Sequence, residues 1–202
     1  MKKIEQNKIK KKEALYNTAF SLFTTKGTTK TTISDIVEKA GVAKGTFYLY
    51  FKDKYDIHNK LVIHKTTEMF YRAHEALLKT ELNSFEEEFF FIIDSILEEL
   101  EQNHPLLTLI YKDLSWGVFE SVCQKLPDED YEFYQSYLEL LAKYNRNFTN
   151  PKLMLYTIIE LVGSTCYSCI LFQQPASLSE YKPYLYRAIN GILNEFSADI
   201  CE

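Results

Sequence analysis

The segment from residue 44 to residue 54 concentrates side chains that suit contacts to nucleic acid. Lysine ammonium and tyrosine hydroxyl groups donate hydrogen bonds to phosphate oxygens, and a bare glycine backbone or a small threonine can approach a base edge closely. The same residues would also form an ordinary solvated helix face, although two exposed tyrosines are costly for solubility alone. The residues concerned are Lys44, Gly45, Thr46, Tyr48, Tyr50 and Lys54.

The distribution of charge separates a basic start from an acidic remainder. The net charge of -5 over the whole chain argues against a nucleic-acid partner if it is taken as an average. Residues 1–60, however, hold 13 lysines against six acidic residues, a net +7, whereas residues 61–202 hold 10 basic and 22 acidic residues, a net -12. Such a basic module can contact phosphates while the acidic part repels them.

Residue types that serve metal binding or catalysis occur without a convincing arrangement. Cys166 and Cys169 have C-x-x-C spacing, but they fall inside an apolar helical pattern with no second ligand pair, so core packing is favoured over a redox or metal role. The four histidines form no tight cluster. Glycine-rich phosphate loops and the G-x-S-x-G and H-E-x-x-H motifs are absent from the sequence. We therefore expect neither an enzyme nor a metal or cofactor.

Two short helices are predicted on either side of a glycine turn. Thr32 with Asp35 three residues later forms a capping-box start, and apolar residues then recur at helical spacing up to Gly41, which suits the left-handed conformation that ends a helix. A second short helix covers residues 44–51, and a longer one covers residues 8–26. Helices this short are marginal alone, so they must pack together as a helix-turn-helix.

The remaining sequence is also read as helical, which gives an all-α fold class. Six glycines and five prolines lie between apolar-periodic stretches. The longest apolar run, from Ile158 to Phe172, contains Glu160 and is too short to span a membrane comfortably, and the Lys-rich start is not a signal sequence, so we expect a cytoplasmic protein. The expected helices occupy residues 54–78, 84–102, 128–144, 150–172 and 177–196, with shorter pieces between 106 and 124.

One run of residues carries a resemblance to a known family: Gly27, Thr31-Thr32-Ile33, Ile36, Ala40 to Tyr48, Tyr50-Phe51 and Lys54. This run resembles the N-terminal DNA-binding domain of TetR-family regulators over about residues 10–58. The departures are mild, such as Ala43 where the family commonly has serine. The resemblance implies DNA contacts, with Thr32 on a phosphate, and we assign them to Thr31, Thr32, Ala43, Lys44, Gly45, Thr46, Tyr48, Leu49, Tyr50 and Lys54.

The resemblance also implies the architecture and the assembly. We expect a three-helix DNA-binding domain over residues 1–53 and a helical ligand-binding and dimerisation domain over residues 54–202, about nine helices in total. By resemblance the last two helices pair with those of a second copy as a four-helix bundle, while a core within one chain is the alternative. The apolar residues assigned to the dimer interface are Ile158, Val162, Cys166, Cys169, Ile170, Leu185, Ile189 and Ile192.

Aromatic residues are frequent in the C-terminal part and indicate a ligand cavity. Most aromatic residues at helical spacing pack in a core, but tyrosine and tryptophan also supply polar tips that would suit a flat or cationic lipophilic small molecule. The residues assigned to this site are Phe70, Phe90, Tyr111, Trp116, Phe119 and Tyr156.

The function predicted from these features is that of a DNA-binding transcriptional regulator. The dimer would repress from a near-palindromic operator with half-sites about one or one and a half turns apart, and a small molecule would release it. A regulator controlled by a protein partner without an inducer, and a transcriptional activator, remain alternatives. The lysines of the first twelve residues are either a soluble end or an arm that reaches the DNA backbone; the sequence favours neither.

Overall fold

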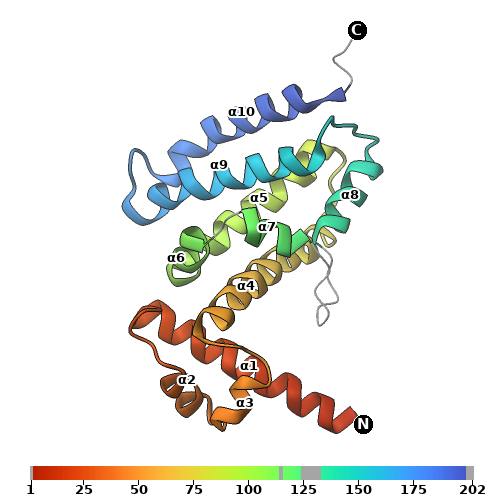
Figure 1. Cartoon of the computed structure of the whole chain (residues 1–202). Helices are drawn as coiled ribbons and strands as arrows, with labels where there is room; N and C mark the ends of the chain where they lie inside the picture. The colour runs from red at the N-terminus through yellow and green to blue at the C-terminus, as the bar shows by residue number, and fades with distance from the viewer. Residues whose placement is uncertain (1, 114–115, 124–132, 199–202) are drawn as a thin grey trace. The chain divides into compact units, whose positions relative to one another are not determined.

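The computed structural model describes residues 2–113, 116–123 and 133–198, and in these ranges the chain forms ten helices and no strand. The all-α fold class is thereby confirmed. The chain divides into two compact units, one up to Lys65 and one from Thr66 onward. Figure 1 shows the helices in chain order, and α4 (Lys54–Leu77) begins in the first unit and ends in the second.

The N-terminal unit holds α1 (Lys2–Thr25), α2 (Ile33–Ala40), α3 (Lys44–Tyr48) and the first turns of α4. Thr32 caps α2 through the expected capping box, in which its side chain accepts from the Asp35 amide and the Asp35 carboxylate accepts from the Thr32 amide. Gly41 ends the helix with φ 67°, the left-handed conformation that favours glycine. Phe47 and Phe51 are buried one turn apart, so α3 packs its aromatic face inward.

The Asp35 carboxylate stabilises the start of α2, and this effect depends on its negative charge. The Lys26 ammonium lies 2.6 Å from the Asp35 carboxylate and, together with hydrogen bonds from Thr32, lowers the pKa of Asp35 to about 2. A carboxyl group whose pKa is lower in the folded state stabilises the fold above its unfolded pKa, and that contribution disappears as the pH falls through the folded pKa.

The variant Asp35→Asn is therefore expected to unfold at a lower urea concentration than the parent protein at pH 7. The difference should stay constant down to about pH 4 and shrink between pH 4 and pH 2, where the parent carboxylate takes up its proton. Urea unfolding followed by circular dichroism across this range measures the difference. If the two midpoints differed equally at pH 7 and pH 2, the charge of Asp35 would not be the cause.

The C-terminal unit is built from helices around an apolar core. The helix α9 contacts α5, α6 and α10, and Figure 1 shows α9 and α10 running side by side. Asn150 and Ser177 cap these two helices through their side chains, and Pro151 occupies the first turn of α9 as expected. The elements are α5 (Phe85–Gln102), α6 (His104–Asp113), α7 (Trp116–Cys123), α8 (Phe133–Lys143), α9 (Pro151–Phe172) and α10 (Leu178–Phe196).

The structure differs from the expected helices mainly at their ends. The helix α1 begins at Lys2, six residues before the expected start, and α3 ends at Tyr48 because the backbone then tightens into turns that lead to α4. The expected start of a helix near residue 128 lies outside the described residues. The helix α9 is longer than the apolar run alone and meets the length and hydropathy criteria for a membrane span, but a core helix of a soluble protein also meets them.

Candidate DNA-binding face and interior cavity

The recognition segment, residues 43–54, presents its polar side away from the core. Phe47 is fully buried, whereas Tyr48 is 52% exposed and Leu49 is 78% exposed. Ala43, Lys44 and Gly45 are exposed as well, and Thr46 is half-buried. A short helix that buries one aromatic side chain and exposes its lysine, glycine and tyrosine leaves these groups available to a groove of DNA.

Apart from Thr32, three of the expected contact residues have side chains with hydrogen-bond partners inside the unit. The Thr31 side chain is fully buried and donates to the Gly27 carbonyl oxygen at 2.8 Å, so the expectation that it faces DNA is corrected. The Tyr50 hydroxyl donates to the carbonyl of Lys8 at 3.3 Å, and the Lys54 ammonium donates to the carbonyl of Thr29 at 3.0 Å. Both side chains are half-buried and fasten the segment to the rest of the unit.

Thr32 keeps an exposed position at the start of α2. Its hydroxyl accepts a hydrogen bond from the Asp35 amide at 3.0 Å, and its own amide donates to the Asp35 carboxylate at 2.9 Å. The hydroxyl hydrogen is still available to donate, so Thr32 can contact a phosphate oxygen without giving up its capping role.

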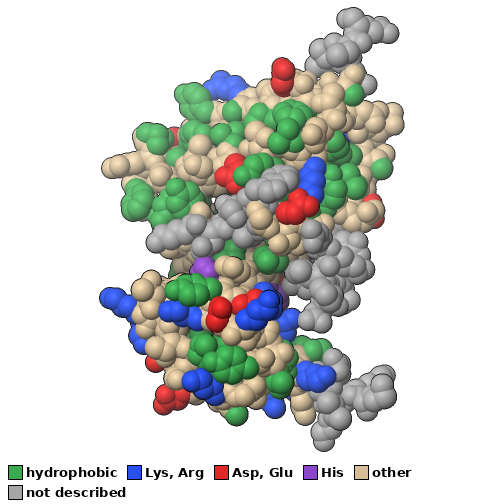
Figure 2. Space-filling model, in the orientation of Figure 1, with side chains coloured by type: hydrophobic (Ala, Val, Ile, Leu, Met, Phe, Trp, Pro, Cys, Tyr) green, Lys and Arg blue, Asp and Glu red, His purple; other side chains and the backbone are tan. Residues whose placement is uncertain are grey.

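A groove beside α3 joins the recognition segment to lysines of α1, for which the sequence left a DNA-contacting role open. Its volume is about 500 Å³, and α1 supplies lysine side chains along one wall. Figure 2 shows lysine side chains spread over this N-terminal unit. The sequence could not decide between this role and a soluble end, because the distance of these lysines from α3 along the chain hides their closeness in space. The lining residues are Asn7, Lys8, Lys11, Thr46, Leu49 and Tyr50.

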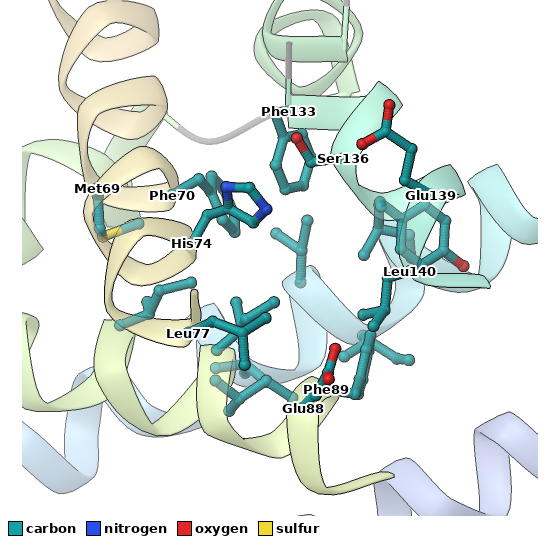
Figure 3. Close-up of a pocket in the computed structure, with 18 of the residues that line it drawn as sticks. Met69, Phe70, His74, Leu77, Glu88, Phe89, Phe133, Ser136, Glu139 and Leu140 are labelled. Atoms are coloured by element: carbon teal, nitrogen blue, oxygen red, sulfur yellow. The ribbon is translucent and has the colours of Figure 1, made fainter. Parts of the chain in front are cut away.

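The C-terminal unit contains a largely apolar cavity of about 520 Å³, lined by α4 to α9. Figure 3 shows Phe70 and His74 of α4 on one side and Phe133, Ser136 and Leu140 of α8 on the other. Aliphatic side chains of α5 and α9 complete its walls. A cavity of this size and character is typical of a site for a small lipophilic molecule.

Only part of the expected aromatic set lines this cavity. Phe70 and Phe119 belong to its wall. Phe90, Tyr111 and Tyr156 do not, because Phe90 packs on Tyr186 of α10 and Tyr111 stacks on Tyr167 of α9, at ring distances of 4.5 and 3.7 Å. Tyr156 is half-buried, with its ring against that of Phe119. The side chain of Trp116 lies outside the described residues.

A buried carboxylate lies in the cavity wall. Glu88 accepts hydrogen bonds from the Lys143 ammonium and, at 2.8 Å, from the Tyr144 hydroxyl. The side chain of Glu88 is 7% exposed, whereas that of Lys143 is 57% exposed. The hydrogen bond to Glu88 raises the pKa of Lys143, so the ammonium group stays charged at neutral pH. Sequence patterns gave no sign of this pair, since 55 residues separate its members.

Six of the eight apolar residues assigned to a dimer interface are instead buried within one chain, where they form the core beneath α9 and α10. They are Ile158, Cys166, Cys169, Ile170, Leu185 and Ile189. Val162 lines the cavity, and Val162 and Ile192 are half-buried. The placement is corrected accordingly, because a side chain already covered by its own chain has little area left for a second copy.

The cysteine pair packs in the core, and burial raises the pKa of Cys166 to about 11, so it remains a thiol at neutral pH. Within the described ranges, groups of three or more His, Cys, Asp or Glu side chains that could hold a metal ion do not occur.

Comparison with known proteins gives one consistent result. The family model for bacterial regulatory proteins of the tetR family matches residues 15–61. The HTH-type transcriptional regulator YvdT of Bacillus subtilis (strain 168) is 30% identical over 195 residues, which cover 87% of this chain and 91% of that protein.

Solved structures give the same fold. The fatty acid degradation regulator FadR of Bacillus halodurans aligns with a TM-score of 0.64 at 19% identity, covering 89% of this chain and 97% of that chain. FadR of Bacillus subtilis, solved in complex with stearoyl-CoA, aligns with a TM-score of 0.58 at 20% identity, covering 93% of this chain and 98% of that chain. The exposed recognition segment and these likenesses agree, and the chain belongs to the TetR family of DNA-binding transcriptional regulators.

Proposed function

We propose that this protein is a ligand-responsive repressor that binds a near-palindromic operator as a homodimer in the cytoplasm and leaves it when a small molecule binds. The observation that carries the proposal is the arrangement of α3, which buries Phe47 and exposes Lys44 and Tyr48. In this assignment the N-terminal unit binds DNA, and the C-terminal unit binds the ligand and forms the dimer.

The operator contacts are assigned to the exposed part of the recognition segment. Lys44 and Tyr48 donate to phosphate oxygens, while Gly45 and Thr46 allow close approach to base edges. Thr32 adds a phosphate contact from the start of α2. The lysines beside the groove, Lys8 and Lys11, extend the same basic surface along α1.

A dimer is proposed because one module of this size offers too small a footprint for tight, specific binding. The surface assigned to it, the dimer face, consists of the exposed and half-buried residues of α9 and α10 rather than the buried ones. The residues of this face recur at helical spacing along both helices. Its members are Leu153, Thr157, Leu161, Ser164, Ser168 and Phe172 of α9 with Tyr184, Ala188, Gly191 and Ile192 of α10.

The interior cavity supports control by a small molecule over the alternative without an inducer, which would fit an interior filled by side chains. Its size suits a lipophilic ligand, and a solved relative of the same fold holds stearoyl-CoA. Because α4 contributes both to the N-terminal unit and to the cavity wall, a ligand that prefers one position of α4 shifts the population of DNA-binding dimers. Linkage requires DNA to weaken ligand binding by the same factor.

The double variant Lys44→Ala with Tyr48→Phe tests the DNA-binding face directly. Purified parent protein is expected to shift a near-palindromic fragment from the DNA flanking its own gene in a gel. Loss of two phosphate donors should weaken this binding at least about tenfold and lower the salt dependence.

Lys79→Ala serves as the control, because Lys79 is an exposed lysine two residues past the end of α4 and its removal changes the charge equally. Equal affinities for the double variant and the control would refute the assignment of α3 to DNA.

A further inference from the structure

The ion pair in the cavity wall is strongly asymmetric. The Glu88 carboxylate is buried on α5, while the Lys143 ammonium reaches it from an exposed side chain at the end of α8. A buried charge is costly without a partner, whereas an exposed lysine regains water at little cost when it swings away. The fixed charge of the cavity is therefore negative, and its positive partner is the replaceable member of the pair.

Besides the ion pair, the lining holds two more carboxylate side chains and His74. Glu81 and Glu139 also belong to it, and Lys143 is its single lysine or arginine among the described residues. The rings of Phe89 and Tyr137 lie in the same wall. Aromatic faces and carboxylates both attract a positive charge, and both disfavour an anion. An anionic head group that approached Lys143 would meet the Glu88 carboxylate beside it.

The cavity is also elongated along α4. It extends from Leu77 to Thr66, about 16 Å of helix axis at the usual rise per residue. Between these ends the wall consists mainly of aliphatic side chains of α5, α6 and α9. At the Thr66 end, the Thr66 hydroxyl is buried, with the residue 2% exposed, and has no hydrogen-bond partner. An unsatisfied buried hydroxyl in a cavity wall indicates a place that an occupant can complete.

We propose that the effector is an elongated amphiphilic cation whose ammonium group replaces that of Lys143 at the Glu88 carboxylate, with its apolar chain extended along α4 toward Thr66. The exchange keeps Glu88 paired, and the Tyr144 hydroxyl holds the carboxylate throughout. Lys143 thus acts as a resident substitute for the ligand. The proposal names the ligand class of the site assigned under the proposed function and rests on that assignment.

The test compares three amphiphilic probes with alkyl chains of the same length and different head groups: dodecylammonium, dodecanoate and dodecanol. Each is used below the concentration at which it forms micelles or aggregates. Isothermal titration of the full-length protein is expected to show the tightest binding for dodecylammonium. Lys143→Ala should strengthen dodecylammonium binding by about threefold to tenfold, because the competing ammonium is gone. Glu88→Gln should weaken it at least tenfold.

The control variant is Glu101→Gln, an exposed carboxylate on the same helix, and it should bind dodecylammonium as the parent does. The melting temperature of Glu88→Gln shows whether this variant folds. If Glu88→Gln does not fold, Lys143→Ala still tests the proposal, because it changes only an exposed side chain. If the parent protein bound dodecanoate most tightly and Lys143→Ala lost this preference, the proposal would be overturned in favour of an anionic ligand. Absence of binding by all three probes would also overturn it.

Operator binding is measured in parallel, so that the two proposals fail separately. Release of operator DNA by dodecanoate instead of dodecylammonium would overturn the charge assignment and leave the ligand-responsive repressor standing. A protein that binds no operator fragment would refute the repressor regardless of the titration results.

Discussion

Arginine in place of Gly191 is expected to leave the chain folded and to prevent the proposed dimerisation. Gly191 lies inside α10 and is exposed, and apart from its chain neighbours and the adjacent helix backbone no atom lies within 4 Å of the position a β-carbon would take. Glycine costs about 0.5–1 kcal/mol relative to alanine inside a helix, so its presence on an exposed face fits a close approach of another helix. A long charged side chain there would separate two copies.

Operator affinity should fall by roughly 100-fold or more as a result, because a monomer engages one half-site and loses the gain of simultaneous binding. Sedimentation velocity measures the oligomeric state, and fluorescence anisotropy with an operator fragment measures the affinity. The matched control is Glu98→Arg, which places the same side chain on an exposed site of α5. A Gly191→Arg protein that still sedimented as a dimer would show that the dimer face lies elsewhere.

Leucine in place of Gly45, in the N-terminal unit, is expected to leave the fold intact and to weaken DNA binding. The site is exposed, and apart from the neighbouring residues of the helix no atom lies within 4 Å of an added β-carbon, so the free protein accommodates the side chain. Leucine also favours the helix over glycine by about 0.5–1 kcal/mol, and the urea midpoint should not decrease. The new side chain would hold α3 away from the base edges.

Loss of two base contacts at about 1–3 kcal/mol each corresponds to a decrease in specific affinity of roughly 30-fold or more. Non-specific binding to unrelated DNA should change much less, since it depends on phosphate contacts. Gly45→Ala, with a single added methyl group, should lose less affinity than Gly45→Leu. Undiminished operator affinity in Gly45→Leu would mean that the backbone of α3 does not approach the bases closely.

The N-terminal unit was largely predictable because its signals are local. Thr32 with Asp35 specifies the start of α2, Gly41 specifies its end, and the aromatic pair Phe47 and Phe51 specifies which side of α3 is buried. The burial of Thr31 could not be predicted, because its partner is the backbone carbonyl of Gly27 and a threonine side chain suits an exposed site equally well. The sequence left a DNA-contacting role of the α1 lysines open but could not place them beside α3, since that placement depends on tertiary packing.

The C-terminal unit was predictable in its helices but not in the faces they bury. The helix α9 is apolar on most sides, so periodicity does not show whether Ile158 or Leu161 is directed to the core. The aromatic residues could not be assigned to the cavity for the same reason. Phe90 packs against a ring of α10 and Tyr111 stacks on a ring of α9, and neither lines the cavity. Ion pairs such as Glu88 with Lys143 join distant helices and leave no pattern in a single sequence.

The continuity of α4 has a practical consequence for engineering. The two units meet inside this 24-residue helix, between Lys65 and Thr66, and no loop separates them. A chimera that exchanges one unit for that of a relative must therefore be joined within a helix. Each inserted residue rotates everything that follows by about 100°, whereas seven residues nearly complete two turns. Hybrid regulators based on this chain thus depend on helical phase more than on linker length.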